Sequence, residues 1–200
     1  MSDAFAAALW AGGYMLELAS LGCAGVNLHG GRSAFLTAGL GGHTPGMKIA
    51  TTPQTLHSGF YTPIQSEPGH EVKAMPVFYG MMLANQFAGC KMLRADCDMH
   101  GANATVYAAR DQRSTRVALF NKDEHLSIHL VLRGLMNATS AAVWRLQAPS
   151  LDATQDVTLA GAQILPHAQW SPRVEEPVEV REGVAHLRVP NSSAALLILK

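Results

Sequence analysis

The sequence has little charge, and its positive and negative side chains balance. Only 15% of the 200 residues are charged, and 15 Lys and Arg stand against 15 Asp and Glu, so the formal net charge at pH 7 is +0. Proteins that bind nucleic acid or anionic lipid usually present a basic patch or a basic overall charge. The composition therefore predicts neither a nucleic-acid partner nor a membrane partner.

Cysteine is equally scarce. The three cysteines, Cys23, Cys90 and Cys97, are odd in number and have no spacing typical of a disulfide framework or a zinc site. No neighbouring residue in the sequence suggests an activated thiolate, so we expect buried small side chains or ordinary thiols. The N-terminal apolar run is interrupted within residues 12–17 by two glycines and a glutamate, which makes it too short to span a membrane.

Motifs of the common catalytic and cofactor sites are missing as well. The sequence contains no Gly-x-Ser-x-Gly elbow, and the glycine-rich "GLGGHTPG" at 39–46 lacks the lysine and the strand–helix context of a phosphate loop. His125 and His129 fall in a strand pattern, where their spacing separates them by about 13 Å. We therefore expect no metal site and no cofactor.

What the chain does have is a hydrophobic fraction of 48%, enough for a core, arranged in two different patterns. Apolar residues at helical spacing predict a helix over 3–21, with Asp3 as cap or first-turn acid and Gly22 as its end. A short buried strand is predicted at 24–29, and a second helix at about 71–88.

Residues 30–70, between that strand and the second helix, are rich in turn-forming dipeptides and are predicted to be a loop. So long a loop in a compact domain is usually functional or disordered. Pro76 falls early in the second helix, where proline is tolerated in the first turn.

From about residue 93 the pattern changes to the period of two that is typical of strands. Short β-branched and aliphatic runs recur every eight to twelve positions or so, which predicts an antiparallel β-sandwich. The runs are "ATVYAARD", "TRVALFNK", "LSIHLVLRG", "SAAVWRLQAP", "VEVREG", "AHLRVPNS" and "AALLILK".

The first 92 residues look like the end of a larger fold, because a lone strand and two helices cannot cover both faces of that strand. We therefore divide the chain into residues 1–92 and the β-sandwich, 93–200. The apolar face of residues 4–21 and both faces of strand 24–29 should lack partners within one chain. This predicts an upstream chain that completes the fold, self-association, or disorder of the N-terminal third.

Several segments, in order along the chain, resemble glycoside hydrolase family 79, the β-glucuronidase and heparanase family. They are "SDAFAAALWAGGYMLELASLGCAGVNLHGG", "HSGFYTPI", "EVKAMPVFYGMMLANQFAG", "RVALFNKDEHLSIHLVL" and "VPNSSAALLIL". The resemblance implies the last helix, strand and helix of a (β/α)8 barrel followed by a β-sandwich. It also implies a retaining hydrolase of β-glucuronides or related uronic-acid glycans, whose two catalytic glutamates lie upstream.

No catalytic residue is therefore expected in this chain, and Glu17 is interpreted as a solvated or salt-bridged helix glutamate. The resemblance implies that Gly59 and Tyr61 bind the uronate carboxylate through backbone and phenol donors. The residues alone favour a turn glycine and a packed tyrosine, and only the resemblance puts the carboxylate site on an equal footing with that interpretation. His29 and Asn27 end the predicted strand 24–29 and either line the pocket or cap the barrel.

Two functions remain open at this point. One is the C-terminal portion of a uronic-acid glycosidase, enzymatic only when complete. The other is a β-sandwich module without catalysis that binds carbohydrate or protein, with residues 1–92 as a packing or dimerisation element.

Overall fold

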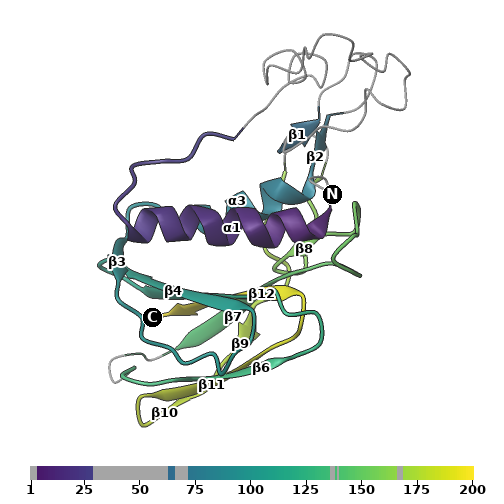
Figure 1. Cartoon of the computed structure of the whole chain (residues 1–200). Helices are drawn as coiled ribbons and strands as arrows, with labels where there is room; N and C mark the ends of the chain where they lie inside the picture. Colours follow the sequence, from purple (N-terminus) through teal and green to yellow (C-terminus); the bar gives the residue numbers. More distant parts are fainter. Residues whose placement is uncertain (1–3, 29–62, 66–71, 136–137, 139, 166–168) are drawn as a thin grey trace, which may run out of the picture.

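The computed structural model describes residues 4–28, 63–65, 72–135, 138, 140–165 and 169–200. Within these residues two helices, α1 (Phe5–Ser20) and α3 (Pro76–Asn85), lie above a stack of antiparallel sheets (Figure 1). None of the described helices is long and apolar enough to cross a membrane.

The large sheet has seven strands, all in antiparallel pairs. Its order is β3-β4-β5-β12-β7-β8, and β9 pairs with β7 off this path. The strands are β3 (Lys91–Leu93), β4 (Ala104–Arg110), β5 (Thr115–Asn121), β12 (Ser193–Leu199), β7 (Ala141–Gln147), β8 (Thr158–Leu159) and β9 (Glu176–Pro177).

The small sheet has three strands in the order β10-β11-β6, and it lies below the large sheet in Figure 1. These strands are β10 (Val180–Arg181), β11 (Val184–Val189) and β6 (Ile128–Leu132). A third, two-stranded sheet, β1 (Ile64–Gln65) and β2 (Lys73–Ala74), precedes α3.

The large sheet is the middle of three layers. Successive side chains of a strand point to opposite faces, so each long strand contributes to a core on both sides of the sheet. Phe120 and Leu196 belong to the core that the sheet shares with the helices, whereas Leu119 and Leu197 belong to the core that it shares with the small sheet. All four side chains are 0% exposed. Both faces of the central strands are thus covered, which explains their nearly continuous apolar sequence.

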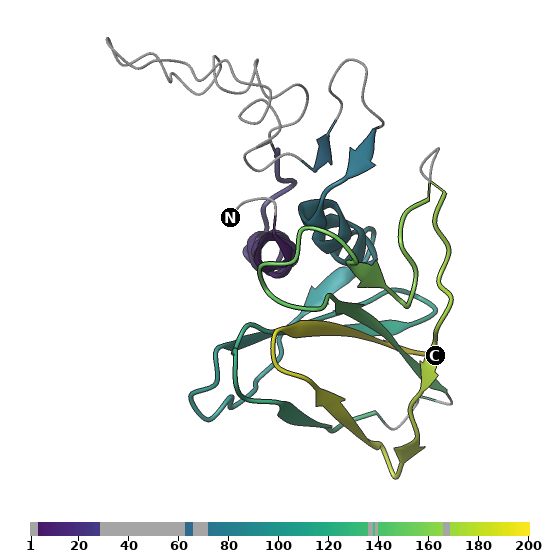
Figure 2. The same cartoon turned by 90° about the vertical axis from the view of Figure 1, so that its right-hand side faces the viewer.

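The helix layer is tied to the sheet by large side chains of α1. Phe5, Leu9 and Leu16 are buried at 0%, 1% and 2% exposure, in one cluster with Tyr107 and Phe120 of the sheet. Figure 2 looks along α1 and shows both helices side by side on the sheet (Figure 2). The prediction that the apolar face of residues 4–21 lacks partners is therefore wrong, because it packs against the face of the large sheet that points away from the small sheet.

The C-terminal end of α1 is formed as the glycine predicts. Gly22 adopts φ +85, its N–H donates to Ala19 O at 3.1 Å, and the N–H of Cys23 donates to Leu18 O at 2.9 Å. This pair of bonds is the Schellman motif, which satisfies carbonyl groups that the helix leaves unpaired. At the other end the N-cap is Ala4 without a side-chain cap bond, and the first turn has no acidic residue. Asp3, predicted as cap or first-turn acid, lies outside the described residues.

The second predicted helix is shorter than expected. It was predicted over about 71–88, but it begins at Pro76, which occupies the first turn, and ends at Asn85. The residues before it form the short strand β2. The two helices approach closely at Gly80, where an added Cβ would lie 2.1 Å from Ala8 O.

All seven runs predicted as strands contain strands of the two sheets, which confirms the antiparallel β-sandwich. The strand predicted at 24–29 is different: residues 24–28 belong to no strand, and Ala24, Gly25 and Asn27 are exposed. A strand needs neighbours for its backbone hydrogen bonds, and no described strand pairs with this segment. The division at residues 92 and 93 stays a prediction.

Candidate functional site

Of the four residues predicted to bind substrate, only Asn27 is among the described residues. His29, Gly59 and Tyr61 lie outside the described residues. Asn27 lies in the segment after α1, outside any helix or strand, with an exposed side chain. Their proximity to one another stays a prediction.

Glu17, the acidic residue of α1, contacts the sheet. The Tyr107 hydroxyl of β4 donates to Glu17 Oε2 at 3.1 Å, and burial raises the pKa of Tyr107. Glu17 is exposed, as expected for a solvated helix glutamate, but its partner is a phenol rather than a cation. This bond links α1 to β4, beside the apolar contacts that join the helix to the sheet.

Two neighbouring glutamates, Glu175 and Glu176, accept hydrogen bonds from side chains of β7. Glu175 Oε1 accepts a 3.0 Å bond from Trp144 Nε1, and Glu176 Oε2 accepts bonds from Arg145 Nε and Nη2 at 3.0 and 2.9 Å. Arg145 also donates from Nη1 to Arg188 O at 2.6 Å. Both carboxylates therefore have structural partners, and neither is positioned as a free acid or base.

Cys90 has a cationic neighbour that the sequence did not predict. Arg116 Nη1 lies 2.8 Å from Cys90 Sγ and 2.7 Å from Asp111 Oδ2. The expectation that the cysteines are buried small side chains or ordinary thiols stays a prediction for the reactivity of Cys90. The bond from Arg116, with backbone donors of Arg113 and Ser114, holds the pKa of Asp111 well below its usual range. Cys90 immediately precedes β3, and Arg116 belongs to β5. The two residues come close because β4 pairs with β3 on one side and with β5 on the other.

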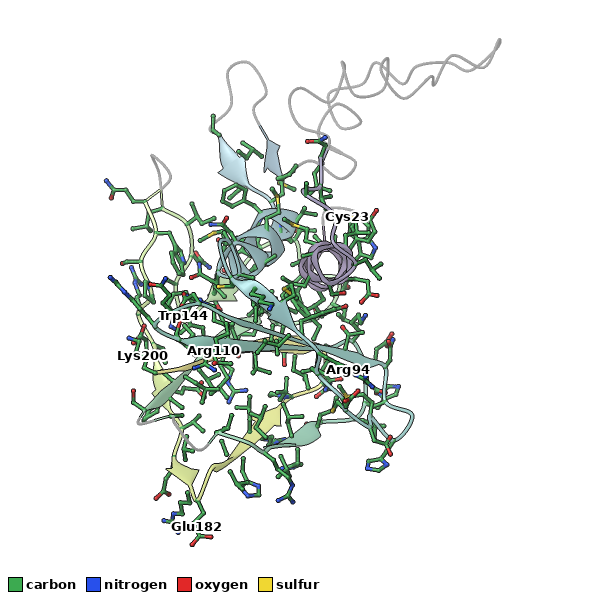
Figure 3. All side chains as sticks on the ribbon, turned by 90° about the vertical axis from the view of Figure 1, so that its left-hand side faces the viewer. Cys23, Arg94, Arg110, Trp144, Glu182 and Lys200 are labelled. Atoms are coloured by element: carbon green, nitrogen blue, oxygen red, sulfur yellow. The ribbon has the colours of Figure 1, made fainter. Side chains whose placement is uncertain are left out.

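A cleft of about 480 Å³ opens between the large and small sheets, at the end where β4 turns into β5. Figure 3 faces this end of the sandwich, where Arg94, Arg110 and Lys200 lie (Figure 3). Apolar side chains from both sheets line its interior: Val106, Ala108, Val117 and Leu130.

The polar lining of this cleft is mainly basic. It has two acidic side chains, Asp96 and Asp111, and five basic ones: Arg94, Arg110, Arg113, Arg133 and Lys200. Both acids already bind arginines, since Asp96 pairs with Arg94 at 3.0 Å and Asp111 with Arg116 at 2.7 Å.

Three arginines of the cleft have no acidic partner in the part of the chain that the structure describes. They are Arg110 at the end of β4, Arg113 in the turn that follows, and Arg133 just after β6. Their guanidinium groups can bind an anion. Among the described residues no group of three or more His, Cys, Asp or Glu could hold a metal ion.

Sequence reasoning missed this cleft because its lining comes from separate segments. Arg110 and Arg113 are close in the sequence, but Arg133 and Lys200 join them only through the sheet order β4-β5-β12 and the position of β6. The overall charge of zero also conceals a local excess of arginine. A signal was present only in Arg110, at the end of β4, and Arg113, in the β4–β5 turn.

Comparison with known protein families identifies a match to part of the chain. Residues 106–196 match the glycosyl hydrolase family 79 C-terminal beta domain. The match begins in β4 and ends in β12, so it covers the central strands of both sheets. No curated protein sequence matches this chain.

Solved structures with a similar fold include glycoside hydrolases. A 4-O-α-L-rhamnosyl-β-D-glucuronidase from Fusarium oxysporum 12S, in complex with Rha-GlcA, is 23% identical with a TM-score of 0.50, over 64% of this chain and 30% of that one. An arabinofuranosidase of family 51 from Xanthomonas axonopodis pv. citri is 14% identical with a TM-score of 0.49, over 70% and 29%. The chain thus spans less than a third of the length of either structure.

Proposed function

Because the chain carries the glycosyl hydrolase family 79 C-terminal beta domain over residues 106–196, we propose that it is the C-terminal portion of a retaining glycoside hydrolase. Its substrates are β-glucuronides or related uronic-acid glycans. The observation that carries the proposal is the family match over the strands that build both sheets.

The first 92 residues are, in this proposal, the last helix, strand and helix of a (β/α)8 barrel, and residues 93–200 are the β-sandwich. The arrangement of α1 supports this, since it packs on the outer face of the large sheet and is followed directly by the unpaired segment 24–28. A barrel strand has a neighbour on each side. Upstream strands would supply the backbone partners that this segment lacks.

The substrate class rests on the family and on one similar structure. The Fusarium enzyme is a β-D-glucuronidase in complex with a disaccharide that contains glucuronic acid. In this chain Gly59 and Tyr61 are proposed to bind the uronate carboxylate, with His29 and Asn27 at the edge of the same pocket. Neutral donors suit a carboxylate because charge-assisted hydrogen bonds are strong and bury no second charge.

Catalysis in this proposal depends on two glutamates outside the chain. A retaining hydrolase needs two carboxyl groups about 5–5.5 Å apart, one as nucleophile and one as acid and base. Of the described glutamates, Glu17, Glu175 and Glu176 each hold a structural contact. The purified chain should therefore not hydrolyse an aryl β-glucuronide.

This expectation is tested by assaying the pure chain with 4-nitrophenyl β-D-glucuronide against a buffer blank. Turnover that disappears in a Glu17→Gln or Glu175→Gln variant would place catalysis inside this chain and refute the proposal. Turnover that survives every such substitution would indicate a contaminating enzyme, which a further purification step removes.

A second function is favoured by the basic cleft. A β-sandwich that binds a carbohydrate or a protein without catalysis needs a surface site, and the cleft between the two sheets is one. The two functions differ in what lies upstream of Met1: the glycosidase requires barrel strands with glutamates, and the module does not.

A further inference from the structure

We propose that the cleft between the large and small sheets binds a saccharide that carries carboxylate groups. Arg110, Arg113 and Arg133 would hold the carboxylates, and the apolar interior would contact the sugar ring. The choice of a uronic acid among carboxylated sugars rests on the proposed function. The preference for an anionic sugar rests on the cleft alone.

The position of Arg110 follows from the register of β4. Val106, Ala108 and Arg110 alternate along the strand, so they share the face toward the small sheet, and all three line the cleft. Opposite them Leu130 of β6 closes the interior, and Arg133 follows where β6 ends. The three arginines thus line a cleft whose interior is apolar, and their side chains are exposed to solvent.

The charges of the cleft favour an anion. Both lining acids are already neutralised by arginines, Asp96 by Arg94 and Asp111 by Arg116, the second pair half-buried. Arg110, Arg113 and Arg133 remain as cations without acidic partners in the described residues. A planar guanidinium binds a carboxylate through two parallel hydrogen bonds, which favours this group over a spherical anion.

The rest of the lining suits a sugar rather than a flat aromatic ligand. Gln112, Ser114 and Thr115 supply neutral polar groups beside the arginines, and no Phe, Tyr or Trp lines the cleft. The cleft offers no aromatic ring on which a sugar could stack, so a neutral sugar should bind weakly and charge must supply most of the affinity for an anionic one. The volume of about 480 Å³ lies in the range usual for small-ligand sites, roughly 300–1,000 Å³.

The binding test uses the whole chain, labelled with ¹⁵N, and follows its amide signals during titration with a hyaluronan hexasaccharide, which alternates glucuronic acid and N-acetylglucosamine. Chitohexaose, which has the same length without carboxylates, is the matched control ligand. We expect shifts confined to residues 93–97, 106–117 and 130–135 with hyaluronan and none with chitohexaose. The affinity should fall as salt is added.

Variants assign the binding to the arginines. The double variant Arg110→Gln/Arg133→Gln should weaken hyaluronan binding about tenfold or more, because two charge-assisted bonds are lost. Arg173→Gln/Arg181→Gln removes the same charge from exposed residues that do not line the cleft, and should change the affinity less than about twofold. Should the first variant fail to fold, the shift map of the unaltered chain decides alone.

Three results would overturn the proposal. They are no shifts at the cleft with hyaluronan, equal binding of chitohexaose, or tighter binding at the cleft by a poly-glutamate peptide of the same charge, which would point to a protein partner. The outcome is independent of the proposed function. Binding at the cleft stands even if the complete protein does not hydrolyse glucuronides, and its absence leaves the hydrolase proposal untouched.

Discussion

Asn121, at the end of β5, shows how one buried polar side chain fixes two loops. It is 0% exposed, and its Nδ2 donates to Leu126 O at 2.7 Å and to Pro190 O at 3.0 Å, with a longer contact to Val189 O at 3.3 Å. Its Oδ1 accepts from the N–H of Asp123 at 3.2 Å. One side chain thus joins the β5–β6 loop to the β11–β12 turn.

Asn121→Leu should destabilise the chain by about 2–4 kcal/mol, because it leaves buried carbonyl groups without a donor. Chemical denaturation followed by circular dichroism measures the change. Asn191→Leu is the matched control, since exposed Asn191 donates only to Glu124 O and should cost less than about 1 kcal/mol. Equal losses in the two variants would contradict the role given to Asn121.

Tyr61 provides the residue-scale test of the uronate site, in a complete enzyme that contains this chain. Tyr61→Phe should lower kcat/KM for a β-glucuronide, with a loss of transition-state stabilisation of about 1.5–3 kcal/mol. The kcat/KM for the matching β-glucoside should fall less, because only a carboxylate makes a charge-assisted bond with the phenol. Gly59→Ala should lower both, because a methyl group obstructs close approach of the backbone. An equal effect of Tyr61→Phe on the two substrates would make Tyr61 a packing residue.

At the scale of elements, the contact between α1 and α3 depends on glycine. A Cβ on Gly80 would lie 2.1 Å from Ala8 O and 3.1 Å from Gly12 N, both of them backbone atoms that cannot rotate away. Gly13 is also helical, but a Cβ there would lie 3.8 Å from Thr105 Oγ1, an ordinary contact. The helix pair therefore has no room for a side chain at Gly80 but can accept one at Gly13.

Gly80→Ala should destabilise the chain by about 1–3 kcal/mol, since the helices must separate. Gly13→Ala should stabilise it by about 0.5–1 kcal/mol, because alanine favours the helix and meets no obstacle. Thermal unfolding of the two variants beside the unaltered chain measures both. A stabilised Gly80→Ala variant would contradict the close approach of α1 and α3.

The long strands could be predicted from the sequence, whereas some of the shortest could not. β4, β5, β7 and β12 each extend over seven residues, long enough for an aliphatic run bounded by turn residues to be recognised. Strands of two residues, such as β8 and β9, exist only because β7 pairs with them, and no local pattern marks them. Segment 24–28 shows the converse, since a strand-like sequence without a pairing neighbour forms no strand.

The candidate sites differ in the same way. The Gly59–Tyr61 pair is a local sequence pattern and was found by resemblance, whereas the basic cleft is assembled from β3, β4, β5 and β6 and has no local pattern. At the end of α1, Gly22 could be read directly, because its positive φ is required by the bonding of the helix end itself.

At the scale of the whole molecule, the chain is a three-layer body in which the helices and the small sheet cover opposite faces of the large sheet. The prediction that α1 lacks partners failed because the sheet covers its apolar side. Trp10 and Tyr14 remain 43% and 41% exposed, with their rings stacked at 5.1 Å. Self-association stays a prediction, which light scattering of the pure chain measures.

The central claim is that this chain completes a retaining uronic-acid hydrolase whose catalytic glutamates lie upstream. Its most direct test is kcat/KM for 4-nitrophenyl β-D-glucuronide, measured with the protein translated from the gene together with the coding sequence that precedes Met1. The account predicts turnover with retained β configuration, lost when either of two upstream glutamates is replaced by glutamine. A longer protein that folds but does not hydrolyse the glucuronide, or an upstream sequence without such glutamates, would contradict it.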